Sequence, residues 1–224
     1  MIQLKKELGV DNLIKNLYII RHGEAKHLVG DGLTGGWTDS DLTEKGRGQA
    51  HVTGKRMLDL LGSGDFELYS SDFSRAKETA EIIGSYFDKN PVPVKSLREQ
   101  NNGNAANVST EEARKMAFPM SEPVMDWVHY PNAESWRSFN GRVFECMNGI
   151  EQESKETVVI VSHRRTIISI IHWWLDFSED YIKKVSFDIE PSSLTHLRIN
   201  KWGEKTISKL NETMDITRQG GSSS

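Results

Sequence analysis

The 224-residue chain has one cysteine, Cys146, six prolines and no long apolar run. A single thiol excludes an internal disulfide framework and any zinc site built from four thiolates. The longest strongly apolar stretch, residues 167–175, is interrupted by polar residues and covers only about half of a bilayer span. Near the N-terminus, Lys5 and Asp11 interrupt the apolar block that a signal peptide needs. We therefore expect a cytoplasmic protein that does not contact a membrane.

An excess of positive charge is also missing. The chain has 28 Lys and Arg against 32 Asp and Glu, a formal net charge of −4. This balance provides no basic field to hold a nucleic acid or an anionic membrane. Hydrophobic residues make up 37% and charged residues 27%, which is typical of a globular chain that can bury a substantial core.

The chain reads as a single domain. Residues 17–212 contain no internal repeat and no Pro/Gly-rich boundary. Residues 1–16 are predicted to form a short helical extension. The segment 213–224 ends in Gly and Ser residues and is predicted to be a flexible tail.

Strand and helix patterns alternate along this domain. The short apolar runs 17–20 and 157–161 are typical of strands covered on both faces. Further strands are expected at 66–70, 93–97, 194–199 and 206–210, the last two at an edge, and helices at 43–61, 73–87, 110–117, 134–150 and 165–175. Asp72 is the expected N-cap of the second helix. The alternation predicts an α/β fold, a three-layer α/β/α sandwich with a mostly parallel central sheet.

Ligands of such sheets bind beyond the carboxyl ends of the strands. The first strand runs into Arg21-His22-Gly23, and the run 157–161 leads into Ser162-His163-Arg164-Arg165. Arg75 follows the second strand, and Glu99 follows the third. We therefore expect two histidines, several arginines and one glutamate to meet at one edge of the sheet.

The arginines at these strand ends also break a local rule. Arg75, Arg164 and Arg165 fall in first helical turns, where a cation opposes the helix dipole by about 0.3–1 kcal/mol. An anion bound between the two helix N-termini would make these contacts favourable. The remaining histidines have no metal-ligand spacing, so we interpret them as surface or core residues and predict no metal site. These histidines are His27, His51, His129, His172 and His196.

An ordered series of short motifs accompanies these residues. It comprises Arg21-His22-Gly23-Glu24, Gly36-Trp37, Asp41 to Gly46 with Gln49-Ala50, Ser70-Ser71-Asp72 with Arg75 to Ala80, Leu97-Arg98-Glu99, Glu134-Ser135 and Val161-Ser162-His163. Over roughly residues 17–200 the chain resembles branch 1 of the histidine phosphatase superfamily, whose fold is phosphoglycerate mutase-like.

The resemblance implies a role for each strand-end residue. His22 is the nucleophile that becomes phosphorylated, and Glu99 acts as general acid and then as general base. Arg21, Arg75 and His163 form the phosphate pocket, with His163 also part of the catalytic set. A neutral imidazole can attack phosphorus in line, two guanidinium groups can neutralise the phosphoryl oxygens, and a protonated His163 would add charge. This chemistry requires no metal and no cofactor.

The chain also departs from the family pattern. Ala25 and Leu28 replace residues that are often Ser or Thr and Asn in the family, and Arg164 replaces a frequent Gly. Residues 101–107 replace the usual aromatic segment on the leaving-group side. Together, Lys26, Arg98 and Arg164 are candidate contacts for a second anionic group of the substrate. Trp127, His129 and Tyr130 are candidates to cover the pocket.

Three functions fit these residues. The first is a metal-independent phosphatase that hydrolyses a small phosphorylated metabolite through a phosphohistidine. The second is a phosphoglycerate mutase with the same intermediate. The third is a non-catalytic phosphate-binding regulatory module. Only 88 positions separate Arg75 from His163, and the mutases that the chain resembles have a longer insert there, which favours hydrolysis. The oligomeric state is not predicted.

Overall fold

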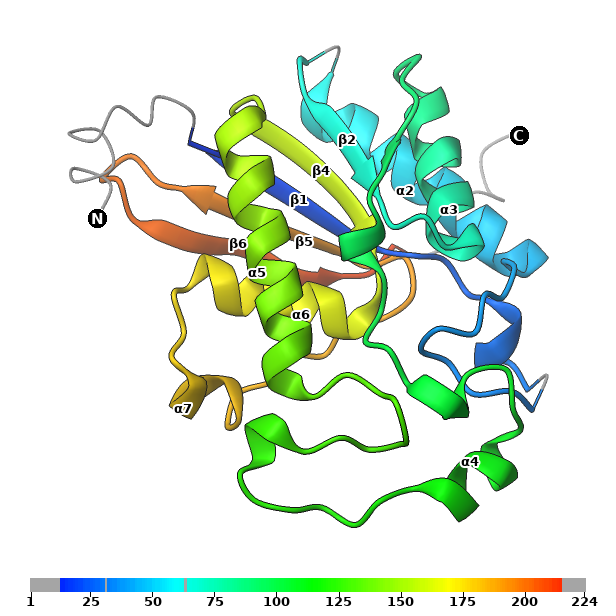
Figure 1. Cartoon of the computed structure of the whole chain (residues 1–224). Helices are drawn as coiled ribbons and strands as arrows, with labels where there is room; N and C mark the ends of the chain where they lie inside the picture. The colour runs from blue at the N-terminus through cyan, green and yellow to red at the C-terminus, as the bar shows by residue number, and fades with distance from the viewer. Residues whose placement is uncertain (1–12, 31, 63, 215–224) are drawn as a thin grey trace.

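The computed structural model describes residues 13–30, 32–62 and 64–214. Within these residues the chain forms a six-stranded sheet in the order β3-β2-β4-β1-β5-β6 (Figure 1). The predicted helix in the N-terminal extension lies mostly in residues 1–12, and the predicted tail mostly in 215–224, so both lie outside the described residues. No helix in the described ranges has the length and apolarity needed to cross a membrane.

Four strands of the sheet are parallel, and two form an antiparallel hairpin beside them. The parallel strands are β1 (Asn16–Arg21), β2 (Glu67–Ser70), β3 (Val92–Pro93) and β4 (Thr157–Ser162), and the hairpin is β5 (Leu194–Ile199) with β6 (Lys205–Glu212). Arg21 at the end of β1 is in register with Ser162 at the end of β4. The next residues, His22 and His163, therefore leave the sheet from neighbouring strands at the same level.

Helices cover both faces of the sheet, because side chains alternate along the central strands. Leu17 and Ile19 of β1 pack into one buried cluster with α5 (Trp136–Glu153) and α6 (Arg164–Trp174). Tyr18 and Ile20 pack into a second cluster with α2 (Glu44–Leu61) and α3 (Ser74–Ser85). Figure 1 shows α5 and α6 crossing one face of the sheet. The predicted three-layer α/β/α fold is confirmed.

Two predicted strand features are wrong. The strand expected at 93–97 ends at Pro93, and Lys95–Leu97 form a 3-10 turn. Pro91 and Pro93 have no N–H to donate to a neighbouring strand. The Leu97 side chain is fully buried in the core. The hairpin strand β5 is not an edge strand, because it lies between β1 and β6.

The start of α3 also differs from the prediction. Asp72 does not cap this helix; its carboxylate accepts hydrogen bonds from Arg98 Nε and Nη2 at 2.6 and 2.7 Å. Asp39, from a distant loop, accepts from the Ser74 backbone N–H at 2.8 Å and from its hydroxyl at 2.9 Å. The first N–H of the helix thus finds its hydrogen-bond partner in a residue distant in the sequence. Local sequence spacing cannot indicate such a cap.

The segment between β3 and α5 is mostly irregular. It contains α4 (Thr110–Met116), as predicted, capped by a reciprocal pair of contacts between Ser109 and Glu112. A short helix that was not predicted, α7 (Glu179–Ile182), follows α6. The 3-10 turns of the described residues are η1 (Lys26–Leu28), the turn η2 (Lys95–Leu97) named above, η3 (Gly103–Ala105) and η4 (Val124–Asp126).

Candidate active site

The turn after β1 is held by backbone contact with the first turn of α2. A Cβ atom added to Gly23 would collide with the carbonyl of Gly46, and one added to Gly46 would collide with the carbonyl of Glu24. Both positions therefore require glycine. Gly23 N–H also donates to Thr79 Oγ1 on α3 at 3.1 Å. These contacts fix the backbone on which His22 stands.

Other motif residues support the same turn. The Glu24 carbonyl accepts from Thr43 N–H at 2.9 Å, and the Glu24 N–H donates to Gln49 Oε1 at 2.8 Å. The Thr43 hydroxyl also caps α2 by accepting from Gly46 N–H at 3.0 Å. The motif Asp41 to Gly46 with Gln49 thus positions the loop that follows β1.

The His22 ring is buried, with 2% of the residue exposed. Its Nδ1 lies 2.7 Å from the Gly23 carbonyl, which only accepts hydrogen bonds, so the proton of the neutral ring is on Nδ1 and the lone pair on Nε2. Burial first, and then the charges of Arg75 and Arg21, hold the His22 pKa well below its ordinary value. The ring is therefore neutral and nucleophilic at neutral pH.

His163 lies beside His22, with ring centroids 5.2 Å apart. Its Nε2 is 2.8 Å from Ser71 Oγ, and its buried Nδ1 has no hydrogen-bond partner among the described residues. Burial, followed by the charge of Arg75, also holds the His163 pKa well below its ordinary value. We therefore expect a neutral His163 ring here, while a protonated His163 beside a bound phosphoryl group stays a prediction.

Both arginines of the predicted phosphate pocket are buried next to the histidines. Arg75 is 1% exposed and donates to the carbonyls of Thr38 and Gly36 at 2.8 and 2.9 Å. Arg21 donates to the Ile189 carbonyl at 2.6 Å. Burial lowers both pKa values, that of Arg75 to about 10, so both side chains remain charged at neutral pH.

Among the described residues, these two cations form no direct ion pair. Within the described part of the chain, neither Arg21 nor Arg75 has a carboxylate within 4.0 Å, and the Nε of each is buried without a hydrogen-bond partner. Buried charge is unfavourable unless it is paired. With the unpartnered Nδ1 of His163, these groups form a pocket suited to a small anion that accepts several hydrogen bonds.

Glu99 borders this pocket, since it lines a cavity with Gly36, whose carbonyl accepts from Arg75 Nη2 at 2.9 Å. The charge of Glu99 also raises the pKa of both Arg21 and Arg75. Its carboxylate accepts from the Gln100 N–H at 2.9 Å and from the Arg165 backbone N–H at 3.3 Å. The fold thus brings Arg21, His22, Arg75, Glu99 and His163 together from four separate parts of the chain.

A cavity of about 410 Å³ adjoins the pocket on the Glu99 side. His129 and Tyr130 form part of its wall as a stacked pair with ring centroids 4.2 Å apart. Trp127 lies behind them, with its ring centroid 5.0 Å from that of His129. His129 is exposed, in line with its interpretation as a surface residue, and with Tyr130 it lies at the place expected of a residue that covers the pocket.

Sequence reasoning did not assign Arg165 to this cavity, although Arg165 is part of the wall. Its guanidinium lies over the Trp136 ring at 5.4 Å and donates to Gln100 Oε1. The charge of Arg165 also contributes to the lowered pKa of His129, after burial. The sequence did contain one indication of this role. Arg164 and Arg165 both follow His163 in the first turn of a helix, where a second cation is unfavourable unless an anion binds nearby.

The three predicted substrate contacts occupy different places. Lys26 pairs with Asp41 at 2.8 Å on the surface, and Arg98 is engaged by Asp72 through two hydrogen bonds. The exposed Arg164 lies 3.9 Å from Asp188, and its charge lowers the pKa of Arg21. Of the three, Arg164 is the one whose charge acts on the anion pocket, through the lowered pKa of Arg21.

A further histidine borders the pocket. The ring centroid of His27 is 6.1 Å from that of His22, and its charge would lower the His22 pKa. It therefore belongs to the surroundings of the nucleophile, which its position in the sequence did not indicate.

Among the described residues, no group of three or more His, Cys, Asp or Glu side chains is arranged to hold a metal ion. Cys146 is partly buried on α5, and burial raises its pKa to about 11, so its thiol stays protonated.

Residues 17–213 match the model of the histidine phosphatase superfamily, branch 1, and the chain belongs to this family. The 2,3-bisphosphoglycerate-dependent phosphoglycerate mutase of Bartonella henselae is 28% identical over 168 residues, which cover 70% of this chain and 80% of the mutase. The putative phosphoserine phosphatase 2 of Hydrogenobacter thermophilus is 26% identical over 213 residues, which cover 91% of this chain and 100% of that protein. The solved structure of Bacillus stearothermophilus YhfR is 27% identical, with a TM-score of 0.73 over 90% of this chain and 98% of that chain.

The buried histidines predict a pH-dependent stability. Their pKa values are lower in the folded protein than the ordinary value of about 6.5, so below that pH the unfolded chain binds more protons than the folded one. The free energy of unfolding is therefore expected to fall as the pH is lowered from about 7.5 to about 5, by up to about 1.4 kcal/mol per pH unit for each such histidine. Urea unfolding at a series of pH values measures this slope.

The variant His163→Asn should show a shallower slope, because one such group is removed. A free energy of unfolding that stays constant over this pH range would contradict the assignment of neutral, buried rings.

Proposed function

We propose that the protein is a phosphoric monoester hydrolase that acts on a small phosphorylated metabolite through a phosphohistidine, without metal or cofactor. One observation carries the proposal: two buried guanidinium groups, neither in an ion pair with a carboxylate of the described residues, lie beside a neutral His22. A phosphoryl group supplies the missing negative charge, and its phosphorus is the electrophile that an imidazole nitrogen attacks.

In the first step, the lone pair on His22 Nε2 attacks the phosphorus opposite the ester oxygen. The P–N bond forms as the ester P–O bond breaks, and protonated Glu99 gives its proton to the departing oxygen. Arg21 and Arg75 neutralise the three equatorial oxygens. We assign the His163 proton to Nδ1, where it donates to the same oxygens, while the Ser71 hydroxyl donates to Nε2 across 2.8 Å.

In the second step, water replaces the released alcohol. The Glu99 carboxylate takes a proton from the water, the new O–P bond forms and the P–N bond to His22 breaks. Orthophosphate leaves, His22 is neutral again and Glu99 is protonated for the next cycle. The same carboxylate thus serves both steps with no net gain or loss of protons.

The cavity beside Glu99 supports a polar leaving group. Asn101, Asn102, His129 and Arg165 contribute hydrogen-bonding groups to its wall. Its volume of about 410 Å³ suits a small metabolite. We infer that Arg165 and Arg164 provide the cationic contacts for a second anionic group, rather than Lys26 and Arg98, whose charges are engaged by Asp41 and Asp72.

Phosphoglycerate mutase is the second candidate, and the relatives named as mutases support it. Two observations favour hydrolysis. The putative phosphoserine phosphatase aligns over its whole length, whereas the mutase leaves a fifth of its own chain unmatched. The short segment between Arg75 and His163 also lacks the insert expected of the mutases. The fate of the phosphoryl group separates the two activities, since a mutase returns it to a glycerate and a hydrolase releases orthophosphate.

A panel of phosphate monoesters assayed from acidic to neutral pH tests the proposal. We expect release of orthophosphate from several small esters and no formation of an isomeric phosphoglycerate from 3-phosphoglycerate. Absence of orthophosphate release from every ester, with orthophosphate still bound, would instead support a regulatory phosphate-binding module.

Treatment with a chelator provides a separate prediction. Excess EDTA is expected to leave the rate of orthophosphate release unchanged, because guanidinium groups neutralise the phosphoryl oxygens here. The rate is measured before and after dialysis against EDTA, and again after Mg²⁺ or Zn²⁺ is added back. Strong inhibition by EDTA that added metal reverses would contradict the metal-free mechanism.

A further inference from the structure

The segment that carries Glu99 has no helix or strand to hold it beyond the 3-10 turn Lys95–Leu97. Its four consecutive carbonyls, at residues 96–99, all accept hydrogen bonds from side chains of distant elements. The donors are Arg142 to Ser96 at 2.9 Å, Ser162 to Leu97 at 2.7 Å, Thr166 to Arg98 at 2.9 Å and Trp37 to Glu99 at 2.8 Å. The backbone at Glu99 is therefore set by side chains rather than by secondary structure.

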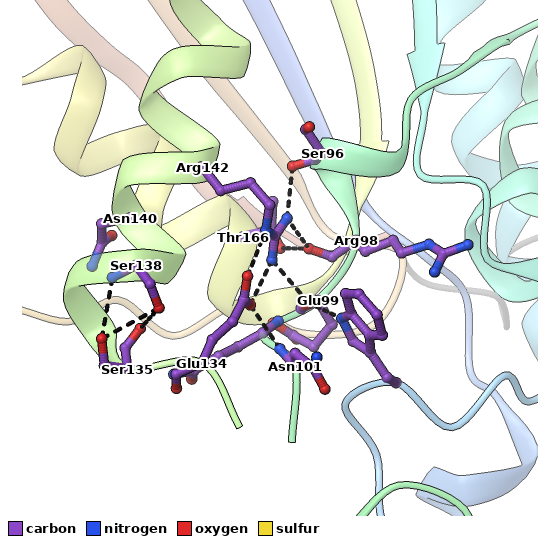
Figure 2. A network of polar contacts seen from close by, with 12 residues as sticks. Ser96, Arg98, Glu99, Asn101, Glu134, Ser135, Ser138, Asn140, Arg142 and Thr166 are labelled. Atoms are coloured by element: carbon purple, nitrogen blue, oxygen red, sulfur yellow. Dashed lines mark hydrogen bonds and ion pairs between the residues drawn. The ribbon is translucent and has the colours of Figure 1, made fainter. Parts of the chain in front are cut away.

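Arg142 on α5 makes the largest number of these contacts. In addition to Ser96, its guanidinium donates to the carbonyls of Arg98 and Glu99, each at 3.3 Å (Figure 2). A single planar cation thus reaches three of the four carbonyls. No shorter side chain could replace this fork of donors.

Glu134 holds Arg142 in place and extends the contact to the other side of Glu99. Its two carboxylate oxygens accept from Arg142 Nε and Nη2, both at 2.8 Å. The same carboxylate accepts from the Asn101 N–H at 2.8 Å, as Figure 2 shows. The pair therefore contacts the backbone both before and after Glu99, and both side chains are about four-fifths buried.

The Glu99 carboxylate has little support of its own. Its hydrogen bonds are to two backbone N–H groups, those of Gln100 and Arg165, and the second is long at 3.3 Å. The direction of this carboxylate consequently depends on where its own backbone lies.

We propose that Arg142 and Glu134 are positioning residues, which hold the Glu99 carboxyl where it can transfer a proton to and from the oxygen that leaves or attacks phosphorus. This inference rests on the proposed function, in which Glu99 is the general acid and base. Glu134 also borders the cavity on the leaving-group side, but the hydrogen bonds of the pair are to each other and to the backbone of 96–101, and we assign their action to that backbone.

The proposal makes a prediction that a merely structural role does not. Protonation matters most when the leaving oxygen is a poor leaving group, as in an alkyl phosphate, and little when it departs readily, as in p-nitrophenyl phosphate. Misplacement of an acid by about 1 Å can cost about 10²-fold in rate. Loss of the Arg142–Glu134 pair should therefore reduce the hydrolysis of alkyl phosphates selectively.

The experiment compares kcat/KM for p-nitrophenyl phosphate, phenyl phosphate and glycerol 2-phosphate, since kcat/KM reports transfer to His22. Glu99→Gln should lose about 10²-fold or more on glycerol 2-phosphate and less than about 3-fold on p-nitrophenyl phosphate. Arg142→Gln should follow the same order, with a loss of about 30-fold on the alkyl ester. Glu134→Gln, which retains Arg142 and is the milder change, should show the same order at about 10-fold.

Arg137→Gln is the matched control, because Arg137 lies on the same helix and pairs with the carboxylates of Asp126 and Glu179 on the surface. It should leave kcat/KM unchanged for all three esters. Equal losses on all esters in the Arg142 and Glu134 variants, with Glu99→Gln still selective, would overturn this inference and leave the proposed function intact. Equal losses in Glu99→Gln would remove Glu99 as the acid, and this inference with it. If Arg142→Gln does not fold, Glu134→Gln decides the question.

Discussion

His22→Ala is expected to reduce the release of orthophosphate by at least about 10⁴-fold, the largest effect of any single change in the chain. The alanine variant has no Nε2 to form the P–N bond, and His163, the neighbouring imidazole, has no hydrogen bond at Nδ1 among the described residues to direct a lone pair in the same way. The loss is measured with p-nitrophenyl phosphate, which needs little help from Glu99. Circular dichroism establishes that the variant is folded.

His51→Ala is the control for this experiment. His51 stands on α2, where its ring is exposed and contacts Tyr86, and the variant should keep full activity. Rapid acid-free quenching with labelled substrate should also trap a phosphoryl group on the wild-type protein that survives alkali, and none on His22→Ala. Activity of His22→Ala above about a tenth of wild type would refute the phosphohistidine mechanism.

Arg75→Met is expected to reduce kcat/KM by about 10³-fold, because a guanidinium that stabilises a transferring phosphoryl group contributes about that much. Methionine fills much of the same space beside Phe73, whose ring lies 5.1 Å from the Arg75 guanidinium carbon. The change removes two hydrogen bonds to carbonyls, but it also removes a desolvated cation that forms no direct ion pair among the described residues. The free energy of unfolding should therefore change much less than the rate.

Thermal unfolding with and without orthophosphate provides the second measurement on this variant. Orthophosphate should raise the Tm of the wild-type protein and have little effect on Arg75→Met, because binding to the folded state alone stabilises it. Arg47→Met, which removes ion pairs with Glu44 on α2 and with the half-buried Glu78 on α3, should keep both the activity and the response to orthophosphate. A normal response in Arg75→Met would show that Arg75 does not hold the anion.

Much of the fold was predictable because strand and helix periods were clear in the central elements. The apolar runs at 17–20 and 157–161 became β1 and β4, and the meeting of His22 with His163 followed from the rule for strand ends. The errors have a common physical origin. Asp39 capping α3 from a distant loop and the burial of Leu97 both depend on contacts that spacing along the chain does not contain.

The same limit applied to the candidate site. Arg98 and Lys26 carried the expected charge, but only coordinates reveal that Asp72 and Asp41 engage those charges. Arg165 was not assigned to the cavity because the opposite wall comes from the mostly irregular segment 101–133, whose path has no periodic pattern in the sequence. The protonation state of His163 could not be predicted from the sequence either, since it depends on burial and on neighbouring cations.

The alignment of Arg21 with Ser162 has an evolutionary consequence. The separation of the two imidazoles is inherited from adjacent hydrogen-bonded strands, whose spacing of about 4.8 Å is common to all β-sheets. Connecting segments can then be lengthened, shortened or exchanged without altering the geometry of the reacting pair. New substrate preferences can arise when a different segment covers an unchanged reaction centre. A chimera with a relative's residues in place of 101–133 is therefore a route to change the substrate preference of this protein.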